Sequence, residues 1–265
     1  MQIILCAFSA NMLLGEVRMK ILTVYANPNP RSFCQAILQQ FTRGLEDAGH
    51  TNEVIDLYAI GFDPVLRSRD YPNWIDEYVP EDILERMNLK QRVLDSCGGP
   101  LQRLIMKRWL RNKSPLDIVK LAKKNKPKEI LEQQQKVAQS QGLAFISPVW
   151  FVGFPAILKG WIERVFTLDF AFSLTPDGWR GDIEGRIPLL RHEKALIINT
   201  TLFNEEAYQA SLGEAMKRLI DDFAFRYPGI KKVEHVYFYA VYGADDKTRQ
   251  NYLERAYLLG KEFEK

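Results

Sequence analysis

Five short runs of apolar residues recur along the chain, and each is bounded by turn residues or by a helical pattern. Apolar residues follow one another in these runs with little alternation, as in strands that are buried on both faces. The runs cover residues 20–26, 52–57, 143–147, 194–200 and 235–241. The pattern predicts five strands of a parallel sheet.

Helical patterns separate these runs. In the first, four apolar residues share one helix face and Gly49 stops the helix; they are Phe33, Ile37, Phe41 and Leu45. Further helices are expected over residues 155–166, 206–226 and 247–264. Repeated β-α-β units predict a doubly wound α/β fold. Five strands indicate the flavodoxin-like order 2-1-3-4-5, whose cofactor crevice lies at the carboxyl ends of strands 1 and 3.

Residues 67–130 interrupt this alternation between strands 2 and 3. The segment is basic: residues 107–128 contain nine Lys or Arg and one acid, Asp117. Two helical pieces are expected, the second starting at Ser114-Pro115, and one face of the first carries Leu101, Leu104, Ile105 and Trp109. The simplest interpretation is a solvated helical insert. The alternatives are a lid over the cofactor edge, a dimer contact or a patch for an anionic surface.

Composition narrows the functional classes. The chain has 265 residues, 46% hydrophobic and 26% charged, as in a globular protein. A net charge of +3 gives no reason to expect nucleic acid as a partner. No apolar run approaches the length of a membrane span. Residues 1–18 precede Met19 and are interpreted as an N-terminal extension from an early start codon, with a short extra strand or interface arm as the alternative. Residues 19–265 are then one domain.

The cysteines and histidines indicate neither a disulfide framework nor a metal centre. Cys6, Cys34 and Cys97 form no C-x-x-C pair, which suits a reducing, cytoplasmic compartment. The three histidines (His50, His192 and His235) are far apart in the sequence, so surface or strand-end positions are expected for them.

The loop NPNPRSF at residues 27–33 joins the first strand to the first helix. The unpaired amides of a helix N-terminus favour a phosphate there, and Arg31 and Ser32 add a charge and a hydroxyl. The loop has no GxGxxG and no Walker lysine, which argues against an ordinary NAD site or an NTPase. A proline turn with an N-capping serine is the simpler alternative.

The loop PVWFVGFP at residues 148–155 follows the third strand at the same crevice. It uses about seven residues where two or three suffice, and it is more apolar than a surface loop should be. Trp150 and Phe151 suit the shielding of a flavin ring, with backbone amides at its polar edge. Ordinary hydrophobic packing is the alternative. Thr200 and Thr201 end the fourth strand beside this loop and offer two hydroxyls.

Three segments, YANPNPRSF, SPVWFVGFPAILKGWIERVF and KALIINTT, resemble the flavodoxin-like NAD(P)H:quinone oxidoreductases of the DT-diaphorase family. The resemblance covers about residues 20–66 and 130–265. It implies a flavoenzyme that binds FAD, with FMN as the alternative, and moves two electrons from NADH or NADPH to a quinone. It also implies a homodimer or a higher homo-oligomer. The alternative function is a flavin-binding electron carrier or an ancillary regulatory protein with little quinone turnover.

The resemblance also assigns residues. It implies that Ser32, Phe33 and Cys34 lie along the flavin phosphates, and Asn27 and Arg31 of the same loop are further candidates for cofactor binding. It also implies that Pro148, Val149, Trp150 and Phe151 border the ring and that Thr200 and Thr201 lie at its polar edge. Tyr208 matches an active-site tyrosine that also contacts the cofactor, and Arg249 and Leu253 match positions that hold the adenine half of FAD.

Several positions depart from the family pattern. Asn27 replaces a histidine in the first loop, and Glu214 replaces the catalytic histidine that follows the tyrosine. The other departures are Leu202 and Phe203 in place of two glycines, and Phe172 and Leu174 in place of two tyrosines of the substrate pocket. We therefore expect the fold and the flavin to be retained and proton delivery to differ.

Overall fold

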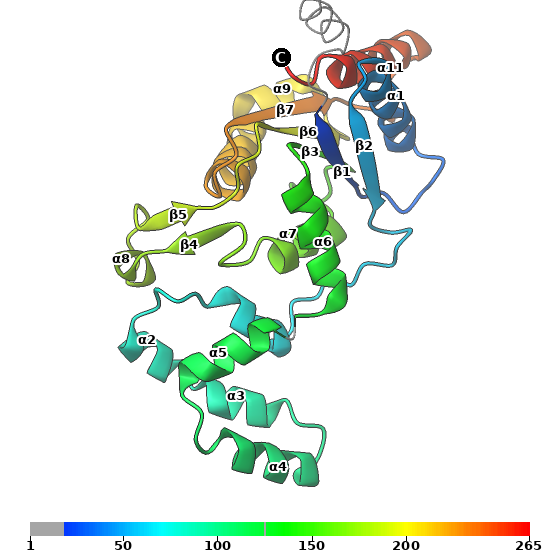
Figure 1. Cartoon of the computed structure of the whole chain (residues 1–265). Coiled ribbons are helices and arrows are strands. Elements are labelled where there is room, and N and C mark those ends of the chain that lie inside the picture. The colour runs from blue at the N-terminus through cyan, green and yellow to red at the C-terminus, as the bar shows by residue number, and fades with distance from the viewer. Residues whose placement is uncertain (1–18, 125) are drawn as a thin grey trace, which may run out of the picture.

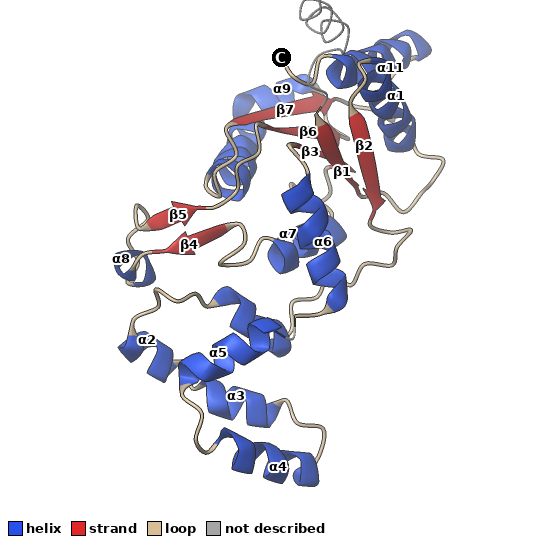
Figure 2. Ribbon diagram, viewed as in Figure 1, coloured by secondary structure: helices blue, strands red, loops and turns tan. Residues whose placement is uncertain are grey.

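Five parallel strands form the central sheet of the chain, of which the computed structural model describes residues 19–124 and 126–265. The strands lie in the order β2-β1-β3-β6-β7 (Figures 1 and 2), which is the predicted order 2-1-3-4-5 of the five expected runs. Their bounds are β1 Lys20–Tyr25, β2 Thr51–Asp56, β3 Gly142–Pro148, β6 Lys194–Thr200 and β7 Lys232–Phe238. The fold prediction is confirmed. The expected extension at residues 1–18 lies outside the described residues.

Helices cover both faces of the sheet because neighbouring residues of each central strand point to opposite sides. In β3, Ala144 and Ile146 pack with α1 (Phe33–Asp47) and α11 (Asp246–Lys261). Leu143 and Phe145 pack on the other side, against α6, α7 and a helical run after β6. Two hydrophobic cores therefore hold β3 between them. The helices of the second side are α6 Lys128–Gln139, α7 Ala156–Val165, α9 Glu205–Ala207, η2 Tyr208–Leu212, α10 Gly213–Met216 and η3 Lys217–Arg226.

Some boundaries and elements differ from the sequence prediction. The last strand starts at Lys232, three residues before the expected start, and ends at Phe238. A two-stranded antiparallel sheet, β4 (Phe172–Leu174) with β5 (Arg186–Pro188), was not predicted, nor was α8 (Pro176–Trp179) between them. Strands of three residues are too short to show a period of two. The helix expected over 206–226 is present, but η2 and η3 have the wider turns of a π-helix.

The insert has a small hydrophobic core of its own. Instead of two helical pieces it contains η1 Ser68–Trp74, α2 Glu81–Arg86, α3 Leu89–Asp95, α4 Pro100–Leu110 and α5 Pro115–Lys124. Buried side chains from these elements pack together, including Ile75, Leu84, Leu89, Leu110 and Ile118. The carboxylate of Asp76, fully buried, accepts hydrogen bonds from the Leu174 amide (2.9 Å) and the Trp179 indole (2.8 Å). The insert is therefore fastened to the β4–β5 sheet.

Arg164 of α7 fastens both ends of the insert to the core of the domain. Its side chain is buried, and its Nη1 donates to the Asp63 carbonyl oxygen (2.6 Å) and to Glu129 Oε1 (2.7 Å). Its Nε forms an ion pair with Asp70 Oδ2 at 3.5 Å. Asp63 and Asp70 lie at the entry to the insert and Glu129 at its exit. Gly160, one turn earlier, lets α7 approach this entry, because a Cβ there would lie 2.2 Å from the Pro64 carbonyl oxygen.

Replacing Arg164 by leucine should lower the free energy of unfolding by about 3–5 kcal/mol, because the buried carboxylate of Asp70 then loses its cation. The measurement is urea denaturation followed by circular dichroism. Lys159→Leu is the matched control: it removes a cation from an exposed position of the same helix and should change stability by less than about 1 kcal/mol. Equal losses in the two variants would contradict this account of Arg164.

Candidate functional site

A cleft of about 550 Å³ lies at the carboxyl ends of β1, β3 and β6. It is the crevice expected for this strand order. Four loops, the start of α1 and the start of α11 line it, with Asn27, Asn29, Arg31, Ser32, Phe33, Cys34, Val149, Trp150, Phe151, Thr200, Thr201, Leu202, Val241, Tyr242 and Arg249. The three segments singled out in the sequence therefore meet in space. Of the predicted site residues, Pro148, Tyr208 and Leu253 do not line this cleft.

The first wall is the loop before α1, which the chain holds by its own hydrogen bonds. Asn27 Oδ1 accepts from the Asn29 amide (2.9 Å), and Asn29 Oδ1 accepts from the Arg31 amide (2.9 Å). Ser32 caps the helix by accepting from the Gln35 amide at 3.2 Å. The next two amides, of residues 33 and 34, make no hydrogen bond within the described residues, and the first turn of α1 has no acidic residue. This end of the cleft therefore presents two unpaired amides at the positive end of a helix, with no acidic side chain in that turn.

The floor of the cleft contains the Cys34 thiol. Burial raises its pKa to about 12, although hydrogen bonds with Thr200, Asn27 and Tyr25 oppose the shift. The thiol is therefore protonated at neutral pH, and it acts as a packed polar group and not as a nucleophile.

The second wall is a tight turn in which backbone conformation is strained. Trp150 and Gly153 pair with each other through both backbone groups (N···O distances 3.0 and 3.2 Å). Phe151 and Val152, between them, both have left-handed backbones with φ of 45° and 59°. A β-branched residue rarely adopts this conformation. The turn leaves the Phe151 side chain fully exposed at the mouth of the cleft and the amides of residues 151 and 152 without partners among the described residues.

The third wall differs from its prediction. Two free hydroxyls were expected after β6, but Thr201 Oγ1 donates to the Phe203 carbonyl oxygen (2.7 Å) and accepts from the Ala240 amide (3.3 Å). Thr200 is buried beside Cys34. Both threonines therefore shape the loops, and their hydroxyls are already engaged within the chain.

The far end of the cleft is formed by Arg249. Its guanidinium donates to the carbonyl oxygens of Ala244 (3.0 Å) and Val241 (3.1 Å) and lies 5.7 Å from the centre of the Phe33 ring. Leu253, one turn later on α11, packs against the same hydrophobic core as Phe33. The cleft thus extends from the N-terminus of α1, with its unpaired amides, to the Arg249 guanidinium over the Phe33 ring.

Comparison with known proteins agrees with this geometry: the model of the flavodoxin-like fold family matches residues 19–258. The chain belongs to this family.

Two curated relatives and one solved structure illustrate the likeness. A ribosyldihydronicotinamide dehydrogenase-like protein of Penicillium crustosum is 28% identical over 72% of this chain and 61% of its own length. An uncharacterized NAD(P)H oxidoreductase of Haemophilus influenzae is 24% identical over 90% of this chain and 92% of its own. The solved NAD(P)H:quinone oxidoreductase from Methanothermobacter marburgensis superposes with a TM-score of 0.67 at 24% identity, over 94% of this chain and 98% of its own.

The match to several curated relatives is partial. The chain spans 61% of the length of the Penicillium protein and 61% of the ribosyldihydronicotinamide dehydrogenases of Pongo abelii and Homo sapiens. Among the described helices of this family member, none is long and apolar enough to cross a membrane. The described residues also contain no group of three or more His, Cys, Asp or Glu side chains that could hold a metal ion.

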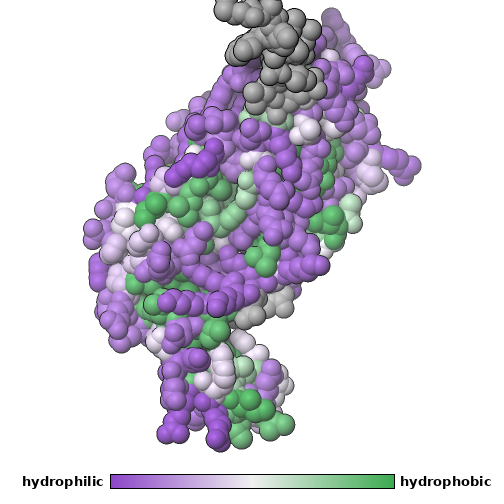
Figure 3. Space-filling view, in the orientation of Figure 1, coloured by the Kyte–Doolittle hydropathy of each residue, from purple (hydrophilic) through white to green (hydrophobic). Residues whose placement is uncertain are grey.

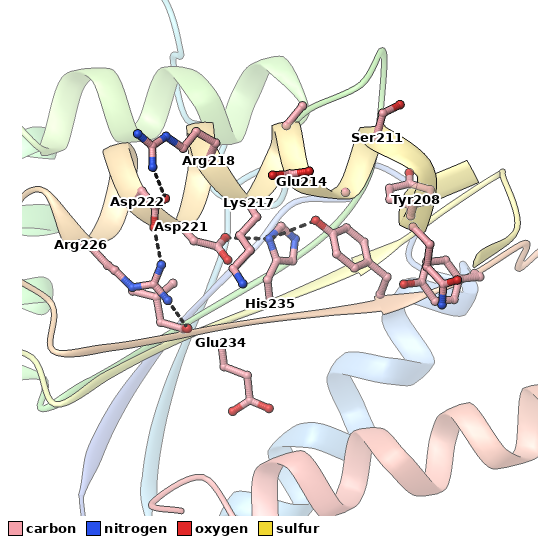
Figure 4. Close-up of a pocket in the computed structure, with 16 residues that line it drawn as sticks. Tyr208, Ser211, Glu214, Lys217, Arg218, Asp221, Asp222, Arg226, Glu234 and His235 are labelled. Carbon is pink, nitrogen blue, oxygen red and sulfur yellow. Dashed lines mark hydrogen bonds and ion pairs between the residues drawn. The ribbon is translucent and has the colours of Figure 1, made fainter. Parts of the chain in front are cut away.

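Tyr208 lies in a second cavity, of about 1200 Å³, between the helical run after β6 and the strand β7 (Figure 4). Its ring is buried, with its centre 4.9 Å from that of Tyr237 and 5.5 Å from that of Tyr239. Burial raises the pKa of the Tyr208 hydroxyl, and a hydrogen bond with Thr201 partly offsets this. Glu214 lines the same cavity. The tyrosine is therefore connected to the cleft by its hydrogen bond with Thr201, which lines the cleft.

His235 forms the floor of this second cavity and is a residue that sequence reasoning missed. Its Nδ1 lies 2.8 Å from Asp221 Oδ1, and its Nε2 lies 2.8 Å from Asn199 Oδ1 (Figure 4 shows the pair with Asp221). Asn199 uses its amide nitrogen on Ser147, so both ring nitrogens of His235 face acceptor oxygens.

The histidine prediction was therefore wrong for His235, which lies in the middle of β7 with its side chain only 4% exposed. His50 and His192 do precede strands, as expected, but both are buried. The sequence gives no sign that His235 contacts Asp221, because the two residues meet only when the helix η3 packs over the strand β7.

The Cys34 thiol should be unreactive toward a disulfide reagent at pH 8 in the folded chain and should react at once in denaturant. Its neutral form is favoured by folding, so its contribution to stability is complete below its usual pKa of 9.0 and is lost as the pH rises through about 12. The variant to use carries Cys6→Ser and Cys97→Ser, which leaves one thiol. Rapid labelling of this folded variant at pH 8 would refute the assignment of a buried, protonated thiol.

Proposed function

We propose that this chain is a flavin-dependent NAD(P)H:quinone oxidoreductase of the cytoplasm. The observation that carries the proposal is the cleft itself. The N-terminus of α1, with its unpaired amides, and the exposed aromatic turn at Trp150 and Phe151 both line it at the switch point of the sheet. A bound flavin supplies the hydride chemistry, which the protein alone lacks. NADH or NADPH and then a quinone are the proposed co-substrates.

Different residues of the cleft are proposed to bind the phosphates and the ring of the flavin. We assign the phosphates to Arg31, Ser32 and the free amides of residues 33 and 34, with Asn27 shaping the loop and Cys34 packing beneath it. Val149, Trp150 and Phe151 border the ring, and the free amides of residues 151 and 152 are the donors for its polar edge. Pro148 and Thr200 are buried supports of this wall.

FAD is proposed over FMN because the cleft extends to Arg249. The guanidinium is fixed by two carbonyl oxygens and presents a flat surface beside Phe33, which suits the adenine half of FAD. Leu253 supports this end of the cleft by packing against the same core as Phe33. FMN has no adenine, so it would leave this end of the cleft empty.

Tyr208 is proposed as the hydrogen-bond donor that stabilises charge developing on the flavin or the quinone. Its raised pKa keeps the hydroxyl protonated at neutral pH, as a donor must be. The Thr201 hydroxyl beside it connects it to the cleft. Glu214 stands in the same cavity in place of the histidine that the resemblance led us to expect.

We propose a homodimer or a higher homo-oligomer because the mouth of the cleft is apolar. Five large side chains are exposed around it: Trp150, Phe151, Val152, Leu202 and Tyr242. A second copy would remove this surface from water. The insert of the same chain does not line the cleft, so a cover by the insert must come from a neighbour. Trp74 packs edge-on against Phe172 within its own chain, which leaves Tyr78 exposed for that role.

The alternative is a flavin-binding electron carrier or ancillary regulatory protein with little quinone turnover. Glu214 favours it, because the proton donor expected at this position is absent. The two functions differ in how fast a nicotinamide reduces the bound flavin.

The purified protein should be yellow, and NADPH added without oxygen should bleach its flavin absorbance within seconds. A quinone added afterwards should restore the colour. Slow bleaching, or none, would favour the carrier function. A colourless protein that takes up neither FAD nor FMN would eliminate both.

Replacing Arg249 by alanine should weaken FAD binding about two- to fivefold, the loss of one exposed cation–π contact, and leave FMN binding unchanged. Fluorescence titration of the protein without cofactor measures both affinities. Lys247→Ala is the control, because Lys247 is exposed on the first turn of the same helix and does not line the cleft. If Arg249→Ala weakens both flavins equally, the arginine holds the loop and not the adenine.

A further inference from the structure

The helix α4 presents an apolar row to solvent. Leu101, Leu104, Ile105 and Trp109 recur at helical spacing on one face, and their exposures are 71%, 66%, 62% and 48%. The helix is held to the insert by other side chains, Met106 and Leu110. In Figure 3 the hydrophobic colour gathers at the tip of the molecule where Figure 1 shows α4. This row is therefore not part of any core of the described chain.

Basic residues flank the row. Residues 100–113 contain five of them and no acid: Arg103, Lys107, Arg108, Arg111 and Lys113. Arg103 pairs with Asp95 (3.3 Å) and Lys113 lies over the Trp109 ring (5.5 Å). The other three make no ion pair within the part of the chain that the structure describes. A groove of about 570 Å³ beside the row is lined by Leu94 and Leu104 together with these basic side chains.

We propose that α4 docks on an anionic lipid surface, with its apolar row in the interface and its basic residues among the lipid headgroups. A helix with Trp, Leu and Ile on one side and Lys and Arg beside them lies in the plane of such a surface. Long basic side chains can keep their charges at the headgroups while their stems cover apolar surface. The proposal does not rest on the flavin chemistry of the cleft.

Charge complementarity favours lipid over a second copy of this chain. Two α4 helices related by a two-fold axis would bring the basic residues of one helix against the basic residues of the other, with no acid on the helix to separate them. Nucleic acid would satisfy the charges but would leave four exposed apolar side chains unused. Anionic lipid matches the charge and the apolar row together.

The test is co-sedimentation of the full-length protein with vesicles of phosphatidylcholine, with or without about a quarter of phosphatidylglycerol, at low and high salt. The protein should bind the anionic vesicles at low salt and be released at high salt. Lys107→Gln, Arg108→Gln and Arg111→Gln combined should weaken binding about a hundredfold, about fivefold for each charge near the surface. Ile105→Glu should also reduce it, because a carboxylate then enters the apolar row.

The control variant removes three exposed basic residues at the opposite end of the molecule: Arg43→Gln, Lys247→Gln and Lys261→Gln. It has the same net charge as the α4 variant and should bind like the unchanged protein. Equal loss in the two triple variants, or no binding by the unchanged protein, would overturn the proposal. So would a dimer in lipid-free solution that Ile105→Glu dissociates, because α4 would then be a self-interface.

Discussion

A single buried guanidinium holds together parts of the chain that are far apart in sequence. Arg164 contacts the chain near residues 63 and 70 and again at Glu129, so an excursion of about sixty residues leaves and re-enters the domain at one point. A buried cation requires such partners, since removing it from water is unfavourable unless charge and hydrogen bonds replace the solvent. The position of α7, and with it the end of the loop that precedes it, depends on this requirement.

That loop shows how a firm support can hold a strained segment. Between the fully buried strand β3 and the anchored helix α7, the turn at Phe151 and Val152 adopts a left-handed conformation that neither residue favours. Pairing of Trp150 with Gly153 holds it there. The same conformation leaves two amides without partners among the described residues and the Phe151 ring exposed at the mouth of the cleft. Local strain therefore coincides with the proposed flavin-binding surface, as it commonly does at functional sites.

The sequence predicts the central sheet well because buried parallel strands and amphipathic helices produce periods that can be read directly. It also predicts that the residues of the cleft lie close together, since loops at the carboxyl ends of neighbouring parallel strands must meet. It does not predict the pair of His235 and Asp221, the contacts of Arg164 or the engagement of the Thr201 hydroxyl. Each of these depends on how two elements approach each other, and no local pattern specifies that distance. The β4–β5 sheet escapes prediction for another reason, because its strands are too short to show a period.

The insert combines contacts that the sequence does not predict with a pattern that the sequence does predict. Its attachment is determined by buried contacts, with Arg164 at its two ends and Asp76 against the β4–β5 sheet, and these are invisible in the sequence. Its outer helix, in contrast, follows the sequence pattern in full, with an apolar row and flanking charges that no part of the described chain covers. Because the attachment does not use the outer face of α4, that face is free for contacts outside the domain. A rigid attachment and an unpartnered amphipathic face are together what a docking element requires.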